Sequence, residues 1–222
     1  MHLPRLGFRI ALLATLALPL GCMNPFKPAN PEPPAAGSIA EDYRIPDSVL
    51  STMAAAIRSR TESGVNAWVH AFADSQQAGD LAYRQFYDGG VKLSWQSANN
   101  LPAPEPWTLE FERGLPTFLF GIRQNASYEF VWTHDPGSPN DDPFTADTVQ
   151  IHRKYQLLAS TSTSADTEII VSGFADLSLQ NKSSRWSIFR WNDRVDPDFG
   201  VNPPNSEFSM SRRRLDSRFS NH

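Results

Sequence analysis

The spacing of the hydrophobic residues changes along the chain, and this change restricts the folds available to it. In the first half apolar residues recur at helical spacing, as at Leu50, Met53, Ala54 and Ile57. In the second half apolar and polar residues alternate. The alternating apolar positions are Tyr128, Phe130, Trp132, Val149, Ile151, Tyr155, Leu157, Ile169, Val171, Ala175, Leu177 and Leu179. A period near 3.6 indicates helices and a period of two indicates strands. Helices followed by hairpin-connected strands predict an α+β domain in which a curved antiparallel sheet wraps the N-terminal helices.

The expected elements can be placed along the chain. One long or once-broken helix begins near Asp47, which is a plausible N-cap, and reaches Phe72. The further elements that we expect are a helix over 80–88 that ends at Gly89-Gly90, strands over 91–95 and 107–112, a short helix over 115–122 with Pro116 in its first turn, and a last strand over 186–191.

The N-terminus has the pattern of a secretory signal. Arg5 and Arg9 precede the apolar run Ile10–Leu20, which is too short to span a bilayer. The only cysteine of the chain follows directly, and the segment 18–22 (Leu-Pro-Leu-Gly-Cys) resembles a bacterial lipobox. We therefore expect a lipoprotein signal peptide over 1–21, and the alternative is an ordinary cleaved signal with an incidental Cys22.

The lipobox resemblance implies a location for the chain. It makes Cys22 the diacylated N-terminus of the mature protein, which anchors the chain in the membrane through acyl chains. Met23 and Asn24 replace the Asp that retains lipoproteins in the inner membrane. The resemblance therefore implies the cell envelope, at the periplasmic face of the outer membrane.

The segment after Cys22 is rich in proline, and the mature chain is acidic. The composition of residues 22–44 is typical of an extended tether that holds the domain away from the membrane; a ligand for a proline-recognition domain is the alternative. Without residues 1–21 the chain has 18 Lys and Arg against 24 Asp and Glu. This net negative charge, without a basic stripe, argues against nucleic acid as a partner.

The order of the expected elements, together with several short motifs, resembles the NTF2-like superfamily, which includes the SnoaL-like domains. The motifs are Phe86-Tyr87-Asp88, Gly114 with the helix after it, Ala175-x-Leu177-x-Leu179 and Arg185-Trp186-x-Ile188-x-x-Trp191-x-Asp193. The resemblance covers residues 45–195. It implies a cone with an apolar pocket between sheet and helices, which relatives use for isomerisation, dehydration, epoxide hydrolysis, ligand binding or dimerisation.

Five residues are candidates for lining such a pocket. Tyr83 and Tyr87 could donate hydroxyl hydrogen bonds to a ligand, although tyrosines at helical spacing are more often core residues. Asp176 would be a buried acid only if its side of the strand faced inward, and a solvent-facing carboxylate is the alternative. Trp95 and Trp132 would line the cone or fill it. His152 falls on the polar face of its strand, which argues against a catalytic role.

The sequence shows no motif for a metal or a cofactor. HExxH, Gly-x-Ser-x-Gly and phosphate-binding glycine loops are absent. The loop over 134–143 is rich in oxygen donors but lacks the ligand spacing and closing Glu of a calcium loop. We expect a charged tail over 196–222, including Arg212–Arg214, that packs loosely on the acidic domain; phosphates of lipopolysaccharide or an acidic partner are the alternative.

These observations favour a domain that binds a small apolar ligand or an envelope protein. The alternative is a metal-free enzyme that acts on a small apolar substrate in the cone by general acid and base chemistry. Two or more buried ionisable groups within hydrogen-bond reach would favour the enzyme. A homodimerisation domain would instead present a flat, exposed, apolar sheet face.

Overall fold

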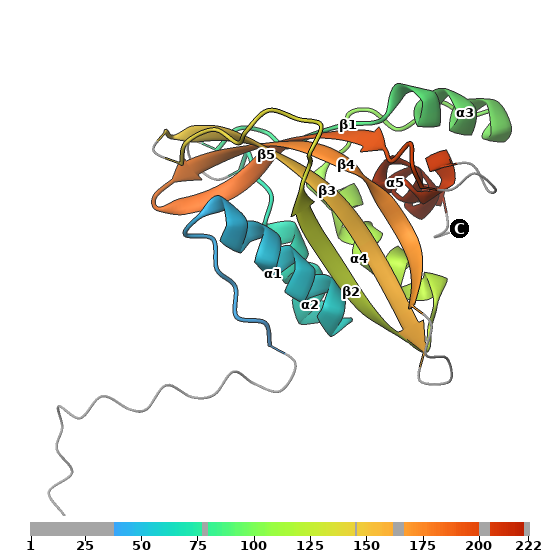
Figure 1. Cartoon of the computed structure of the whole chain (residues 1–222), viewed down its shortest axis with the longest axis horizontal. Coiled ribbons are helices and arrows are strands. Elements are labelled where there is room, and N and C mark those ends of the chain that lie inside the picture. The colour runs from blue at the N-terminus through green and yellow to red at the C-terminus, as the bar shows by residue number, and fades with distance from the viewer. Residues whose placement is uncertain (1–37, 77–79, 145, 162–166, 200–204, 220–222) are drawn as a thin grey trace, which may run out of the picture. The chain divides into compact units, whose positions relative to one another are not determined.

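The computed structural model describes residues 38–76, 80–144, 146–161, 167–199 and 205–219 (Figure 1). The expected signal peptide, Cys22 and the tether as far as residue 37 lie outside the described residues. None of the helices in this described part is both long and apolar enough to cross a bilayer.

The first predicted helix is confirmed as once-broken. Helix α1 covers Pro46–Ser59 and α2 covers Glu62–His70. The N-cap of α1 is Ile45 and not Asp47, because Pro46 supplies the fixed φ that suits a first helical residue. Between the helices, Thr61 caps α2 by accepting a hydrogen bond from the Gly64 amide at 3.1 Å. A Cβ at Gly64 would lie 2.4 Å from the Ala56 carbonyl, so only glycine permits this approach of α2 to α1.

The middle of the chain differs from the prediction in three places. The expected helix over 80–88 is extended chain that contains strand β1, Arg84–Phe86. The expected strand over 91–95 lies in helix α3, Gly89–Asn99, because Asp88 accepts from the amides of Gly90 and Val91 and so starts a helix there. Most of the expected strand over 107–112 lies in helix α4, Leu109–Ile122, which places Pro116 inside the helix and not in its first turn.

The four predicted long strands are confirmed. They are β2 (Ala126–His134), β3 (Thr148–Thr161), β4 (Thr167–Lys182) and β5 (Arg185–Val195). The sheet order is β1-β5-β4-β3-β2. The sheet is mixed and not wholly antiparallel, because β1 pairs in parallel with β5. No hairpin joins these two strands, since helices and the other strands lie between them in sequence. The predicted α+β class, with a curved sheet packed against helices, is confirmed (Figure 1).

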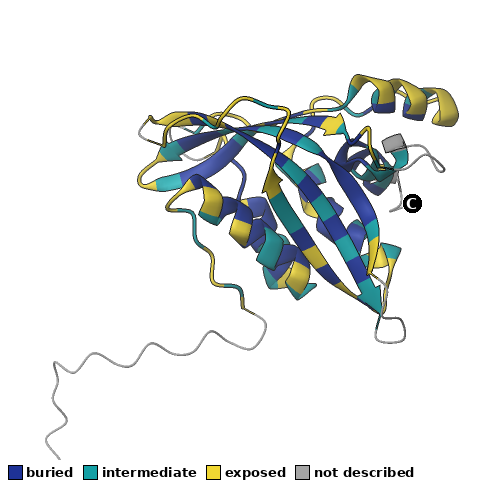
Figure 2. Cartoon of the chain, in the orientation of Figure 1, coloured by how far each residue is buried: buried dark blue, intermediate teal, exposed yellow. Residues whose placement is uncertain are grey.

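The core lies between the helices and one face of the sheet. Helices α1, α2 and α4 cover the inner face, and Figure 2 shows buried residues along the sides of the helices and strands that meet there. Aromatic rings supply much of the packing; for example, Trp132 and Trp191 have ring centroids 5.6 Å apart. Burial of such rings is a major source of folding free energy.

The C-terminal segment belongs to this core, which corrects the expectation of a loosely packed tail. A short 3₁₀ helix, η1, covers Asn205–Phe208 and helix α5 covers Met210–Phe219. Arg214 in α5 has no exposed surface. At the other end, the Tyr43 hydroxyl donates to the Ala67 carbonyl at 3.0 Å, so packing also begins before Ile45. Residues 200–204 lie outside the described residues.

Candidate functional site

Four ionisable side chains meet between the sheet and the helices, and we call Glu112, Arg214, Asp193 and Tyr155 the interior cluster. Glu112 comes from α4, Arg214 from α5, Asp193 from β5 and Tyr155 from β3. All four have 4% exposed surface or less. The cluster therefore occupies the position in which the NTF2-like resemblance predicts a pocket.

Glu112 and Arg214 form a bidentate ion pair. The Nε and Nη2 atoms of Arg214 donate to the two carboxylate oxygens at 3.0 and 2.8 Å. The same oxygens accept from the indole nitrogens of Trp68 and Trp107 at 3.2 and 2.6 Å. The Arg214 guanidinium also stacks 4.2 Å from the ring centre of Trp191. Glu112 is thus surrounded by donors, which is what a buried carboxylate needs.

Asp193 and Tyr155 hold the first turn of α5. The Tyr155 hydroxyl donates to Asp193 at 2.6 Å and accepts from the Met210 amide at 2.8 Å. The other oxygen of Asp193 accepts from the Ser211 amide at 2.5 Å. A carboxylate at a helix N-terminus satisfies its free amides and interacts favourably with the helix dipole. These contacts explain why α5 begins at Met210.

Burial shifts the proton equilibria of the interior cluster. Desolvation raises the pKa of Asp193 above its usual value, although the Arg214 charge and hydrogen bonds from Ser211 and Tyr155 oppose this rise. Burial, and then the charge of Asp193, raise the pKa of Tyr155 well above its usual value. Burial disfavours the charged form of Arg214, but the negative charge of Glu112 outweighs the effect of burial and raises the pKa of the guanidinium. Arg214 therefore stays charged.

The interior cluster contains acid and base groups within hydrogen-bond reach, which is the arrangement that would favour an enzyme. Asp193 and Tyr155, however, direct their polar atoms to each other and to the backbone of α5. Glu112 is occupied by Arg214 and two indoles. In this conformation the cluster binds the C-terminal helix of its own chain and leaves these atoms unavailable to a substrate.

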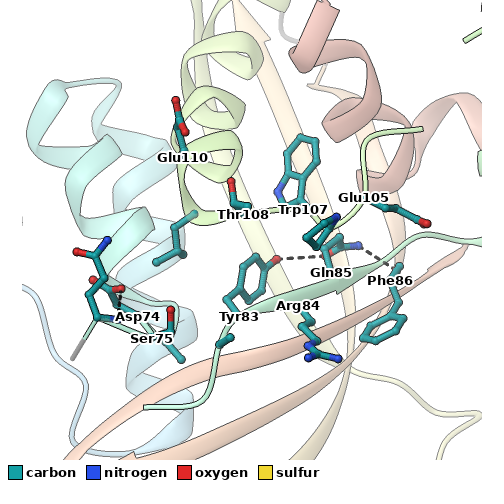
Figure 3. Close-up of a pocket in the computed structure, with 15 residues that line it drawn as sticks. Asp74, Ser75, Tyr83, Arg84, Gln85, Phe86, Glu105, Trp107, Thr108 and Glu110 are labelled. Atoms are coloured by element: carbon teal, nitrogen blue, oxygen red, sulfur yellow. Dashed lines mark hydrogen bonds between the residues drawn. The ribbon is translucent and has the colours of Figure 1, made fainter. Parts of the chain in front are cut away.

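An open groove lies beside the cluster, and we call it the β1 groove. It has a volume of about 850 Å³ and is lined by residues 73–76, 82–86 and 105–110. Its lining includes the nearly buried rings of Tyr83 and Trp107, which form its apolar floor, and the carboxylates of Asp74, Glu105 and Glu110; Figure 3 shows these side chains. The Tyr83 hydroxyl donates to the side chain of Gln85 at 3.2 Å. Burial, and then the charge of Glu112, raise the pKa of Tyr83, so its hydroxyl remains a donor.

The structure brings only some of the predicted pocket residues together. Tyr83 lines the β1 groove. Tyr87 packs edge-on against Trp107, with ring centroids 6.1 Å apart, and donates to the Pro104 carbonyl at 3.2 Å. Trp132 is half-buried and packs against the core, and its indole nitrogen is buried without a hydrogen-bond partner among the described residues. Trp95 lies in a separate small cluster between α3 and α5.

Asp176 lies on the outer face of the sheet and not in the cone. It accepts from Arg194 at 3.1 Å and lies 2.7 Å from the Nδ1 atom of His152. The Ser138 hydroxyl donates to Asp135, not to this histidine. The arrangement is therefore a surface charge network and does not form a serine–histidine–aspartate relay. Because it covers part of the outer face with charge, that face is not a uniformly apolar dimerisation surface.

Local sequence patterns did not indicate that Glu112, Arg214, Asp193 and Trp107 form a group. Glu112 falls in a segment expected to be a strand, and Arg214 falls in a segment expected to be a tail. The helical spacing of Met210, Arg214 and Ser217, all of which are buried, was the available signal for α5. Across the parts of the chain that are described, no three His, Cys, Asp or Glu residues are placed to hold a metal ion.

No family model and no curated protein matches this chain. Solved structures are similar to it at low sequence identity. One is a variant of Rv3472 from Mycobacterium tuberculosis, described as a protein of unknown function (12% identity, 77% of this chain and 85% of that chain, TM-score 0.49). Another is ActVI-ORFA from Streptomyces coelicolor (9% identity, 67% of this chain and 92% of that chain, TM-score 0.47). A third is Aln2 from a Streptomyces species (9% identity, 71% of this chain and 91% of that chain, TM-score 0.46). No residue role is transferred from them to this chain.

Proposed function

We propose that this chain is a lipid-anchored envelope protein, held at the periplasmic face of the outer membrane, whose NTF2-like domain binds a ligand or an envelope protein through the β1 groove. The anchor is proposed from the lipobox-like segment that ends at Cys22. The binding role is supported by one contrast. The interior cluster is filled by the chain's own α5, whereas the groove next to it is open and has an apolar floor.

Site-specific photocrosslinking in the host cell tests the binding role. A photoreactive residue at Thr108 would stand at the groove, because the side chain of Thr108 is exposed and makes no cap hydrogen bond in α4. The matched control is the same residue at Gln150, which is exposed on β3. A discrete adduct from position 108 and none from position 150 is expected. Equal adducts from both positions, or none from 108, would contradict binding at the groove.

Metabolic labelling tests the anchor separately. The full chain should incorporate labelled palmitate and fractionate with the outer membrane, and the Cys22→Ala variant should incorporate none. If the wild-type chain remains unlabelled, the ordinary cleaved signal is the correct interpretation. This result would leave the groove untouched, since the crosslinking experiment reports on the domain alone.

An acid–base enzyme is the second candidate function, and the Asp193–Tyr155 pair is the observation in its favour. A carboxyl group with a raised pKa beside a tyrosine can exchange protons with a substrate. Such chemistry requires α5 to leave the cone, because Ser211 and Met210 occupy both groups. Hydrogen exchange of the α5 amides tests this: exchange far faster than that of the β4 amides would favour the enzyme.

A further inference from the structure

β1 is an edge strand with one free side. Within the described part of the chain it pairs only with β5, through Arg84, Gln85 and Phe86. Alternate residues of a parallel strand direct their N–H and C=O groups away from the neighbouring strand. Among the described residues, no backbone hydrogen bond links 82–86 to a segment other than β5. The Gln85 side chain donates to the Phe86 carbonyl at 3.0 Å, so a further strand can pair with the other backbone groups of this edge or displace that contact.

The β1 groove lies along this edge. Residues 82–86 form one of its sides and residues 105–110 another, so the space beside β1 is walled and not simply open surface. In Figure 3, Tyr83 and Gln85 point toward Trp107 and Thr108, whereas Arg84 points the other way. An entering chain would meet backbone groups at the edge of β1 and aromatic rings at the groove floor.

The charge of the groove favours a cation. Asp74, Glu105 and Glu110 belong to its lining. Lys92 neutralises Glu105 at 2.6 Å, but among the ion pairs of the described residues none involves Asp74 or Glu110. Arg84 points away from Trp107 and Thr108 in Figure 3, so two lining carboxylates, Asp74 and Glu110, keep no cationic partner among the described residues. This arrangement complements a lysine or arginine side chain.

We infer that the β1 groove takes an extended peptide segment of a partner protein, which adds as a parallel or antiparallel strand to the free edge of β1. An apolar side chain of the segment occupies the groove over Tyr83, and a lysine or arginine two positions away reaches Asp74 and Glu110. Residues two apart lie on the same face of a strand, about 7 Å apart. Strand addition of this kind presupposes the groove-binding role proposed above and specifies its ligand class.

Model peptides test strand addition on the full chain. The probe is a rhodamine-labelled hexapeptide in which leucine and lysine stand two positions apart with serine between them (Leu-Ser-Lys-Ser-Leu-Ser), called the leucine–lysine probe and compared with the same peptide methylated at alternate backbone nitrogens. Methylation removes strand hydrogen bonds and leaves the side chains in place. We expect saturable binding by fluorescence anisotropy and about tenfold weaker binding of the methylated peptide. The amides of 84–86 should also gain protection from hydrogen exchange when the unmethylated probe binds.

Two charge-reversal variants locate the binding. Glu110→Lys should weaken binding of the leucine–lysine probe several-fold, and Glu129→Lys should leave it unchanged, because Glu129 is exposed on β2 at the opposite edge of the sheet. Any other combination of results contradicts either strand addition or binding at the groove. Equal binding of the methylated and unmethylated probes that is still lost in Glu110→Lys overturns strand addition and retains the groove.

The remaining outcomes are also decisive. Loss of binding in Glu129→Lys alone would assign the peptide to β2 and overturn both strand addition at β1 and the groove-binding role. If neither probe binds, a cationic peptide is not the ligand of this groove. Photocrosslinking from Thr108 then still decides whether the groove binds another class of molecule.

Discussion

The interior cluster and the β1 groove lie on two sides of Trp107, and they differ in whether their carboxylates have partners. The indole nitrogen of Trp107 donates inward to Glu112, while the residue also lines the groove. Inside, each carboxylate has several donors within hydrogen-bond distance. In the groove, Asp74 and Glu110 have no ion pair among the described residues. The paired interior carboxylates hold α5 in the cone, although the Nη1 atom of Arg214 is buried without a hydrogen-bond partner among the described residues. The groove carboxylates remain available for recognition.

The largest expected effect comes from breaking the interior ion pair. Arg214→Met leaves Glu112 as an unpaired buried charge, so the free energy of unfolding should fall by about 3–5 kcal/mol in urea titrations. Arg58→Met, at an exposed position of α1, is the control and should change it by less than about 0.5 kcal/mol. A small loss in Arg214→Met would mean that water already reaches the pair.

Tyr155→Phe tests whether α5 depends on the core tyrosine. The change removes the donor to Asp193 and the acceptor for the Met210 amide, which should lower the free energy of unfolding by about 1–3 kcal/mol. Tyr87→Phe removes one hydrogen bond from a half-buried ring and should cost less. A larger loss in Tyr87→Phe would place the stabilising tyrosine at the groove side of the molecule.

The pH dependence of stability distinguishes the buried carboxyl from a surface one. Because burial raises the pKa of Asp193 above 3.8, the folded chain keeps a proton that the unfolded chain has already released. The contribution of Asp193 to stability therefore falls as pH rises from 3.8 to the folded-state pKa, and it is level above that value. Urea titrations from about pH 4 to 7 should show a smaller fall with rising pH in Asp193→Asn than in the wild type.

Asp135 on the outer face provides the control of opposite sign. Burial acts against its charge, but hydrogen bonds from Ser138 and Arg194 outweigh burial and hold its pKa below 3.8. Its contribution is present above pH 3.8 and is lost as pH falls through the folded-state pKa. Asp135→Asn should therefore flatten the acid limb. Flattening of the same limb by Asp193→Asn would contradict the raised pKa of Asp193.

The smallest effect is expected from the groove carboxylates. Glu110→Gln should weaken the leucine–lysine probe about two- to fivefold, since an exposed ion pair contributes about 0.2–1 kcal/mol. Raising the salt concentration should lower the affinity of the wild-type chain for the probe toward that of Glu110→Gln, because salt screens exposed charges. The unfolding free energy should not change in Glu110→Gln. A large stability loss would assign Glu110 a structural role.

The strands were predictable because one face of each is buried against the helices. The alternation of apolar and polar residues in β2 to β5 indicates these strands and, with the helices before them, the α+β class. The segment 91–95 forms a helix and not the expected strand; Val91 and Trp95 are four residues apart, so they fit both periods. In α3 these two are buried, and Leu93, which a strand would bury with them, is 69% exposed.

The interior cluster could not be predicted from local patterns. Its members come from α4, α5, β3 and β5 and meet only through the tertiary fold. Three adjacent arginines at 212–214 suggest a solvated tail by composition, whereas the ion pair with Glu112 makes burial of Arg214 favourable. The β1 groove also depends on β1 pairing with a strand about 100 residues later in the sequence.

Fluorine NMR of the full chain labelled with 5-fluorotryptophan tests the contrast between interior and groove most directly. The chain has six tryptophans, so six resonances can be assigned by Trp→Phe substitution. Titration with the leucine–lysine hexapeptide should shift the resonance of Trp107 and leave those of Trp132 and Trp191 in place. Shifts at Trp132 and Trp191 with an unchanged Trp107 would show that ligands enter the cone, and would contradict its closure by α5.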